Sequence, residues 1–212
     1  MSVDSPSSEQ LKELAAEAFL YAFPLAFNLA EVQRFTREGL GAVSSAPFNA
    51  LAHASTLASS EDTFVSINND TVYTMAQLDV TNGPVRLDVP AAGDRYYVLQ
   101  FVDAWTNNFA YVGTRGTGNE AQSYYLVAPD FDGELPADIK TIRLPTRIAS
   151  IVGRWAVAGE ADLPAVSELQ RQLRLTPTAD GPVGLEPLAE GVREDIDVLE
   201  ALRVWGRALP PA

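Results

Sequence analysis

The chain has 212 residues, enough for one domain or one domain with an appendage, and 47% of them are hydrophobic, so it can bury a sizeable core. A formal net charge of −13 argues against nucleic acid and anionic membranes as partners, because both bind basic surfaces. The absence of cysteine excludes disulfide bonds and thiolate chemistry.

The sequence carries no recognisable targeting signal. Residues 1–5 have neither the basic start nor the apolar stretch of a secretory signal. No apolar run reaches the roughly 18 residues that are needed to span a bilayer. We therefore expect a cytoplasmic protein, with a mature exported protein as the alternative.

Residues 7–38 are predicted to form a helix, because apolar residues recur there at helical spacing on one broad face. Ser7 followed by Gln10 has the pattern of a capping box. Pro24 removes a backbone donor inside this run and predicts a kink just before it. Gly39 is expected to end the helix.

Residues 40–62 have weak periodicity and many small polar residues. This composition predicts a long loop, with a short turn of helix at residues 49–53. A loop of this length in a compact domain often carries function.

From residue 64 the hydrophobic period changes to two, which is typical of strands. About eight strands are expected, with turns every ten or so residues, as in an antiparallel β-sandwich or barrel. The clearest of them cover residues 64–80, 85–89, 95–103, 109–113, 123–128, 142–144 and 148–157.

After residue 159 the period becomes helical again, and Asp162 is a candidate cap for a helix with Pro164 in its first turn. Residues 176–190 are a linker rich in proline and glycine, and a second helix follows. The fold prediction is therefore α+β: an antiparallel β-sandwich or barrel with a long N-terminal helix and two C-terminal helices. Its predicted parts are an N-terminal helical segment (1–41), a β-sandwich domain (42–159) and a C-terminal helical appendage (160–212).

The glycine-rich segment 113–118 has two interpretations. It is either a tight β-turn that exposes Arg115 or a loop whose backbone amides, together with Arg115, hold an anion. It matches neither a Walker pattern nor a GxGxxG motif, so we expect no nucleotide and no other cofactor.

Asn69 and Asp70 stand at the start of a predicted strand, where short polar side chains either cap their own backbone or act as ligands at a pocket rim. No EF-hand loop is present to supply the roughly six oxygen ligands of a calcium ion, so we expect no metal. Asp103 shares a strand face with apolar residues, and a carboxylate there must be paired, hydrogen-bonded or protonated. A structural role and a proton-transfer role are both open for it.

His53 is the single histidine of the chain. This excludes a metal site built from several histidines and leaves one candidate for a histidine general base. A structural or solvated histidine in the loop is the alternative.

A resemblance to a known family is carried by short stretches in a fixed order and spacing. They are Tyr21-Ala22-Phe23-Pro24-Leu25, Phe48-Asn49 with His53, Asn69-Asp70-Thr71-Val72-Tyr73, Leu78-Asp79 with Gly83-Pro84, Arg95-Tyr96-Tyr97, Asp103 with Thr106-Asn107, and Gly113-Thr114-Arg115 with Gly118. In these stretches, over roughly residues 15–160, the chain resembles the family called domain of unknown function 1254. The resemblance implies a β-sandwich-like domain with helical additions and no assigned reaction. Members of that family often carry a second, jelly-roll-like domain, called domain of unknown function 1214.

We predict that the protein binds a small polar or anionic molecule, with or without catalysis, in a pocket at one end of the sheet. The predicted catalytic residues are His53, Asp103 and Tyr73, and the predicted ligand-binding residues are Asn69, Asp70, Arg115 and Asn107. The alternative is a structural or assembly module. Because the terminal helices carry more apolar surface than one sheet edge covers, we expect a homodimer or a jelly-roll partner chain. Helices that fold back onto the sheet of the same molecule are the alternative.

Overall fold

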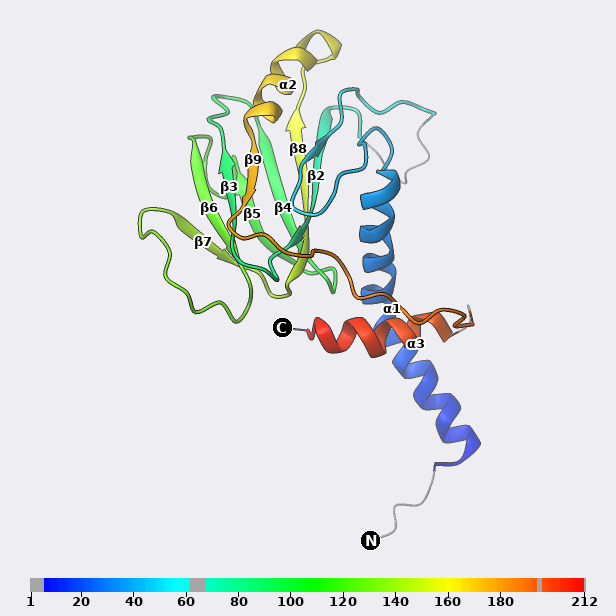
Figure 1. Cartoon of the computed structure of the whole chain (residues 1–212). Helices are drawn as coiled ribbons and strands as arrows, with labels where there is room; N and C mark the ends of the chain where they lie inside the picture. Colours follow the sequence, from blue (N-terminus) through cyan, green and yellow to red (C-terminus); the bar gives the residue numbers. More distant parts are fainter. Residues whose placement is uncertain (1–5, 62–67, 194–195, 212) are drawn as a thin grey trace.

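The computed structural model describes residues 6–61, 68–193 and 196–211, and its architecture is α+β (Figure 1). A five-stranded sheet has the strand order β1-β2-β8-β4-β5, and a four-stranded sheet has the order β7-β6-β3-β9. The strands are β1 (Ala52–His53), β2 (Thr71–Asp79), β3 (Val85–Val89), β4 (Tyr97–Asp103), β5 (Asn108–Gly113), β6 (Gln122–Val127), β7 (Lys140–Arg143), β8 (Ile148–Ala156) and β9 (Arg174–Pro177). Neither sheet closes into a barrel within the described residues.

Both sheets contribute to one hydrophobic core. The alternation predicted for β2 is confirmed: its even-numbered residues from Val72 to Leu78 are buried, whereas Tyr73 and Met75 on the other face are half-buried. At the centre of the core the ring of Tyr97 stacks on Trp155, with centroids 4.8 Å apart. The period-two pattern of the sequence thus decides which side chains enter the core.

The predicted N-terminal helix is confirmed as α1 (Ser8–Glu38), and its capping box is formed. The Ser7 hydroxyl accepts from the Gln10 amide at 3.2 Å, and the Gln10 side chain accepts from the Ser7 amide at 2.8 Å. The helix continues through Pro24, and Figure 1 shows its axis changing direction where it crosses α3. Gly39 follows the helix with a φ of 79°, where a Cβ would collide with the carbonyl oxygen of Val43. Only glycine therefore lets the chain fold back here.

The C-terminal region contains α2 (Leu163–Gln172), α3 (Asp197–Ala201) and a π-helical turn (Leu202–Gly206). Trp205 and Ala201 pack against Leu25 and Leu29 of α1 in a second, smaller core. The last helix therefore rests on α1, as Figure 1 also shows. Among the described residues, no helix combines the length and apolar character that a membrane span requires.

Four details of the prediction were wrong. Residues 52–53 form strand β1 instead of a helical turn, because their backbone pairs with β2. Strands β6 and β7 are parallel, since the long connection between them returns the chain to the same end of the sheet. Strand β9 lies where the linker was expected to begin and pairs with β3. Asp162 makes no cap for α2, because its carboxylate binds the guanidinium group of Arg95. The strand predicted for residues 64–67 falls outside the described residues.

Candidate functional site

A cavity of about 180 Å³ lies on the face of the five-stranded sheet that points away from the core. We call it the Arg154 cavity. Its floor is formed by Tyr73 and Met75 of β2 and by Val152 and Arg154 of β8, and its walls are residues 40–43 and parts of residues 54–58. The strand period explains the floor, because alternate residues of a strand point to one face.

Register places the floor residues opposite each other. In the antiparallel pair of β2 and β8, Tyr73 lies across from Arg154, and Met75 lies across from Val152. The wall forms because the turn after α1 closes on itself, where Leu40 and Val43 exchange two backbone hydrogen bonds of 2.9 and 3.0 Å. The cavity therefore depends on the sheet register and on the glycine that ends α1.

The lining of the cavity is mostly apolar, and Arg154 is its one cation. The guanidinium carbon of Arg154 lies 5.6 Å from the centre of the Tyr73 ring, within the range of a cation–π contact. The hydroxyl of Tyr73 accepts a hydrogen bond of 2.8 Å from Asn68. None of the residues that line the cavity is acidic, so nothing in its lining neutralises the guanidinium charge.

His53 lies on the opposite, core-facing side of this sheet, where its Nδ1 is 2.9 Å from the hydroxyl oxygen of Thr74. That oxygen is fully buried and has two further neighbours: the indole N–H of Trp155 donates to it at 3.0 Å, and the Gln170 amide donates at 3.3 Å. A hydroxyl group has two acceptor sites and one hydrogen. With both acceptor sites filled, its hydrogen points to Nδ1 of His53.

This arrangement defines the protonation state of the imidazole. Nδ1 of His53 accepts a hydrogen bond, so the ring is neutral and its own hydrogen is on Nε2. Burial lowers the pKa of His53 below its ordinary value of 6.5. Protonation of Nδ1 would also bring a third donor to the Thr74 oxygen. The described contacts therefore give His53 a structural role in anchoring β1 and α2 to β2.

Asp103 has a comparable structural environment at the end of β4. It is 2% exposed, and its Oδ1 accepts hydrogen bonds from the backbone amides of Trp105 at 2.9 Å and Asn107 at 2.8 Å. Its other oxygen accepts from the Asn107 side chain at 3.1 Å. The expectation that this carboxylate is buried and bonded to several donors is confirmed. These bonds hold the turn between β4 and β5, in which Thr106 has a φ of 71°.

Asn69 and Asp70 are exposed at the start of β2, beside an Asx turn in which Asn68 accepts from the amide of Thr71 at 3.1 Å. Asn69 lines a shallow groove that also includes Glu160. A capping turn therefore accounts for much of this polar stretch.

Arg115 is exposed, and its guanidinium carbon lies 5.5 Å from the centre of the Tyr96 ring. The amides of residues 116–118 all donate to the carbonyl oxygen of Gly113 at 2.8–3.0 Å. Because these amides already have an acceptor, they are not free to hold an anion. Residues 113–118 therefore form the tight β-turn that was one of the two interpretations of this glycine-rich segment.

The predicted site residues are not brought together at one point. His53 on β1 and Arg115 after β5 belong to opposite edges of the five-stranded sheet, a separation of about 19 Å at the usual strand spacing. Asp103 and Asn107 lie at the other end of β4 from Arg115. Of the predicted residues, Tyr73 lines the Arg154 cavity.

The prediction from the sequence did not include Met75, Val152 and Arg154 as cavity residues. Met75 could have been found from the sequence, because the alternation of β2 places Tyr73 and Met75 on one face. Nothing local indicated that β8 would pair with β2 and bring Arg154 to the same place. Within residues 6–61, 68–193 and 196–211, no group of three or more His, Asp or Glu side chains is arranged to hold a metal ion.

Comparison with solved structures finds a similar fold. The VPA0106 protein from Vibrio parahaemolyticus superposes with a TM-score of 0.74 at 20% identity, over 93% of this chain and 47% of that chain. The chain described here thus spans about half the length of the Vibrio protein. An uncharacterised protein from Burkholderia cenocepacia matches at 13% identity with a TM-score of 0.36, over 98% of this chain and 50% of that one.

No curated protein matches the sequence. The family model described as protein of unknown function (DUF1254) matches residues 48–177, which include the whole Arg154 cavity floor and most of both sheets. The resemblance in the short stretches of the sequence is confirmed by this match, and the chain belongs to the DUF1254 family.

Proposed function

We propose that the protein binds a small molecule with an anionic group in the Arg154 cavity, using the two sheets as a rigid sandwich-like scaffold. The observation that carries the proposal is the guanidinium group of the exposed Arg154, which stands over the Tyr73 ring in a cavity lined mainly by apolar residues and by no acid. A carboxylate is the natural partner of such a group, because arginine binds carboxylates in bidentate fashion.

The size of the cavity limits the ligand. Its volume of about 180 Å³ is smaller than the roughly 300–1,000 Å³ of sites for drug-sized molecules. A short aliphatic carboxylate is the appropriate size. We propose binding and no catalytic step. Tyr73, one of the predicted catalytic residues, lines this cavity and would act there as a hydrogen-bonding group.

Met75 provides a site-specific probe, because the chain contains only two methionines, Met1 and Met75. The test is a titration of protein carrying ¹³C-methyl methionine with butanoate, butanamide and butylamine. We expect butanoate to shift the Met75 signal with saturation, whereas the neutral and cationic analogues leave it unchanged. The Met75→Leu variant assigns the signal.

Arg154→Gln is the decisive variant and should weaken butanoate binding about tenfold or more, the usual worth of a hydrogen bond to a charged group. Arg207→Gln is the matched control, since Arg207 is exposed and lies outside the described cavities. Arg115→Gln tests the site predicted from the sequence. Equal binding by the wild-type and Arg154→Gln proteins would overturn the proposal.

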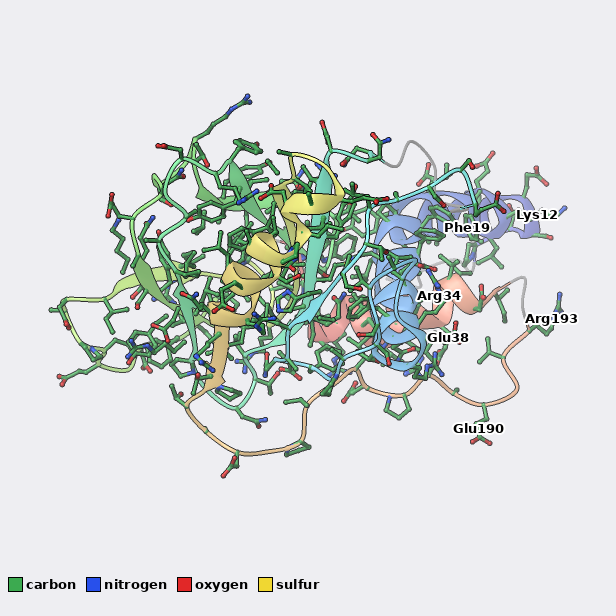
Figure 2. All side chains as sticks on the ribbon, turned by 90° about the horizontal axis from the view of Figure 1, so that it is seen from above. Lys12, Phe19, Arg34, Glu38, Glu190 and Arg193 are labelled. Carbon is green, nitrogen blue, oxygen red and sulfur yellow. The ribbon has the colours of Figure 1, made fainter. Side chains whose placement is uncertain are left out.

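A second function, docking of another folded domain, is favoured by the N-terminal half of α1. Figure 2 shows Lys12 and Phe19 on the part of α1 that extends beyond the sheets. Large apolar side chains are exposed along this part of the helix: Leu11, Leu14, Phe19, Leu20, Tyr21, Phe23 and Phe27. Contiguous exposed surface of this kind marks interaction sites.

The groove beside these residues has a volume of about 620 Å³ and is completed by Val198 and Trp205. Residues 18–30 contain no charged side chain, and Asp197 is the one charged residue in the lining of the groove, so a mainly apolar partner surface fits it. We assign the groove to a domain of the kind that makes up the other half of the longer Vibrio relative. The isolated chain should bind such a domain when the two are co-expressed, and Phe23→Asp should abolish the complex. A complex that survives this substitution would contradict the assignment.

A further inference from the structure

We infer that the ligand is an elongated carboxylic acid with a neutral hydrogen-bond acceptor at its far end, bound across two adjoining cavities. This inference rests on the proposed function and extends it. Its carboxylate would lie at Arg154, its aliphatic part over Met75 and its acceptor at the side-chain amide of Gln77.

The second cavity lies next to the first on the same face of the sheet. Its volume is about 150 Å³, and it lies between the sheet and the second half of α1. Leu40, Met75 and Val152 line both cavities. The two spaces therefore meet at a shared apolar wall.

Three successive cross-strand pairs give the combined site its polarity. Along β2 and β8 they are Tyr73 with Arg154, Met75 with Val152, and Gln77 with Ser150. Along this line the first pair is cationic, the second is apolar and the third is polar. At the usual rise of a strand, the four residues between the outer pairs correspond to about 14 Å, which sets the length of the ligand.

Gln77 supplies the strongest evidence for a far binding group. It is 3% exposed, lines the second cavity, and its Oε1 accepts a hydrogen bond of 2.5 Å from Ser150. No hydrogen bond of its Nε2 is found among the described residues, and this nitrogen is not among the fully buried atoms without a partner, so it is open to the space beside it. The donor is therefore available to an acceptor atom inside the cavity.

The charge around the second cavity favours a neutral acceptor. Glu31 of α1 lines this cavity together with Arg34, and the two form an ion pair with each other. Because Arg34 is already paired with Glu31, it offers no free positive charge to a second carboxylate on the ligand. A hydroxyl or carbonyl oxygen fits the amide of Gln77 without this penalty.

Met75 is suited to the junction of the two cavities. Methionine is unbranched and adapts its side chain to the shape of its neighbours. A change of its rotamer would join the cavities, while the strands on either side remain fixed by their pairing. The methylene groups of the ligand would then lie between Met75 and Leu40, which line both cavities.

The test compares four probes on wild-type protein by the Met75 methyl signal: butanoate, decanoate, ω-hydroxydecanoate and decanedioate. We expect ω-hydroxydecanoate to bind at least about tenfold more tightly than butanoate, because it buries additional methylene groups. Decanoate should bind less tightly than ω-hydroxydecanoate, and decanedioate less tightly than either. The Gln77→Met variant should remove the advantage of the hydroxyl group and leave butanoate binding unchanged. Gln100→Met is the control, since Gln100 lies on the same sheet face outside the described cavities.

The outcomes separate this inference from the proposed function. If butanoate binds in an Arg154-dependent way but ω-hydroxydecanoate binds no more tightly, the elongated site is refuted and the short-carboxylate site stands. If no probe shifts the Met75 signal, both are refuted. The ranking of probes on the wild-type protein decides the question even if Gln77→Met fails to fold.

Discussion

The hydroxyl oxygen of Thr74 lies 2.9 Å from Nδ1 of His53, and its other two contacts favour a neutral imidazole whose Nδ1 accepts from this hydroxyl. The same oxygen accepts hydrogen bonds from Trp155 and Gln170, so one buried hydroxyl links β1, β2, β8 and α2. His53 was a candidate general base in the sequence, and in the structure its contacts are those of a residue that packs in the core.

His53 should make the stability of the protein depend on pH near neutrality. Its pKa is lowered by burial in the folded protein, so the unfolded chain binds more protons as the pH falls below about 6.5. The stability that neutral His53 contributes is therefore fully present above that pH, and it decreases as the pH falls from there through the pKa of the folded state. Urea unfolding between pH 5.5 and 7.5 should show this decrease in the wild-type protein. His53→Asn keeps an acceptor for Thr74 but cannot titrate, so the difference between the two proteins should vary with pH.

Asp103→Ala should destabilise the protein by about 2–4 kcal/mol, because two backbone amides lose their acceptor in a buried turn. Those amides belong to Trp105 and Asn107. Asp103→Asn keeps an oxygen in the same place and should cost less than half as much. Chemical denaturation measures both values. Equal stability of the alanine variant and the wild-type protein would contradict the structural role.

The ion pair of Arg95 and Asp162 should stabilise the attachment of α2 in an acid-sensitive way. Hydrogen bonding by Arg95 lowers the pKa of Asp162 to about 2. The contribution of the pair is therefore complete above the ordinary pKa of 3.8 and decreases as the pH falls through the value of the folded state. Protection factors of α2 amides, which correct for the intrinsic exchange rate at each pH, should be lower at pH 2.5 than at pH 4.5. In Asp162→Asn the protection factors should be low at both pH values.

The apolar surface of α1 should cause self-association when no partner domain is present. Leu20 is 73% exposed and Phe27 is 58% exposed, and burial of one such side chain is worth roughly 1.5–3 kcal/mol. Light scattering at micromolar concentration should give a mass above that of the monomer. High salt should not reduce it, because the contact is apolar. Leu20→Asp should give a monomer, whereas Lys12→Asp, on the same helix, should not. A monomeric wild-type protein would refute the prediction.

Much of the fold follows from local patterns in the sequence. The 31 residues of α1 begin at a capping box that Ser7 and Gln10 form by themselves. Alternation in β2 separates the core side chains from Tyr73 and Met75 without reference to any other strand. These features are predictable because they depend on neighbours within a few residues.

The candidate site was decided by contacts between distant parts of the chain. Tyr73 and Arg154 are separated by most of the β region, and only the register of β2 with β8 places them side by side. The pairing of residues 52–53 with β2 likewise replaced the expected helical turn. A periodic pattern states which face a residue occupies, but it does not state which strand lies next to it. Strand order and register depend on how all the strands share one core, and for that reason only the tertiary structure placed a cation, an apolar floor and a buried amide on one line.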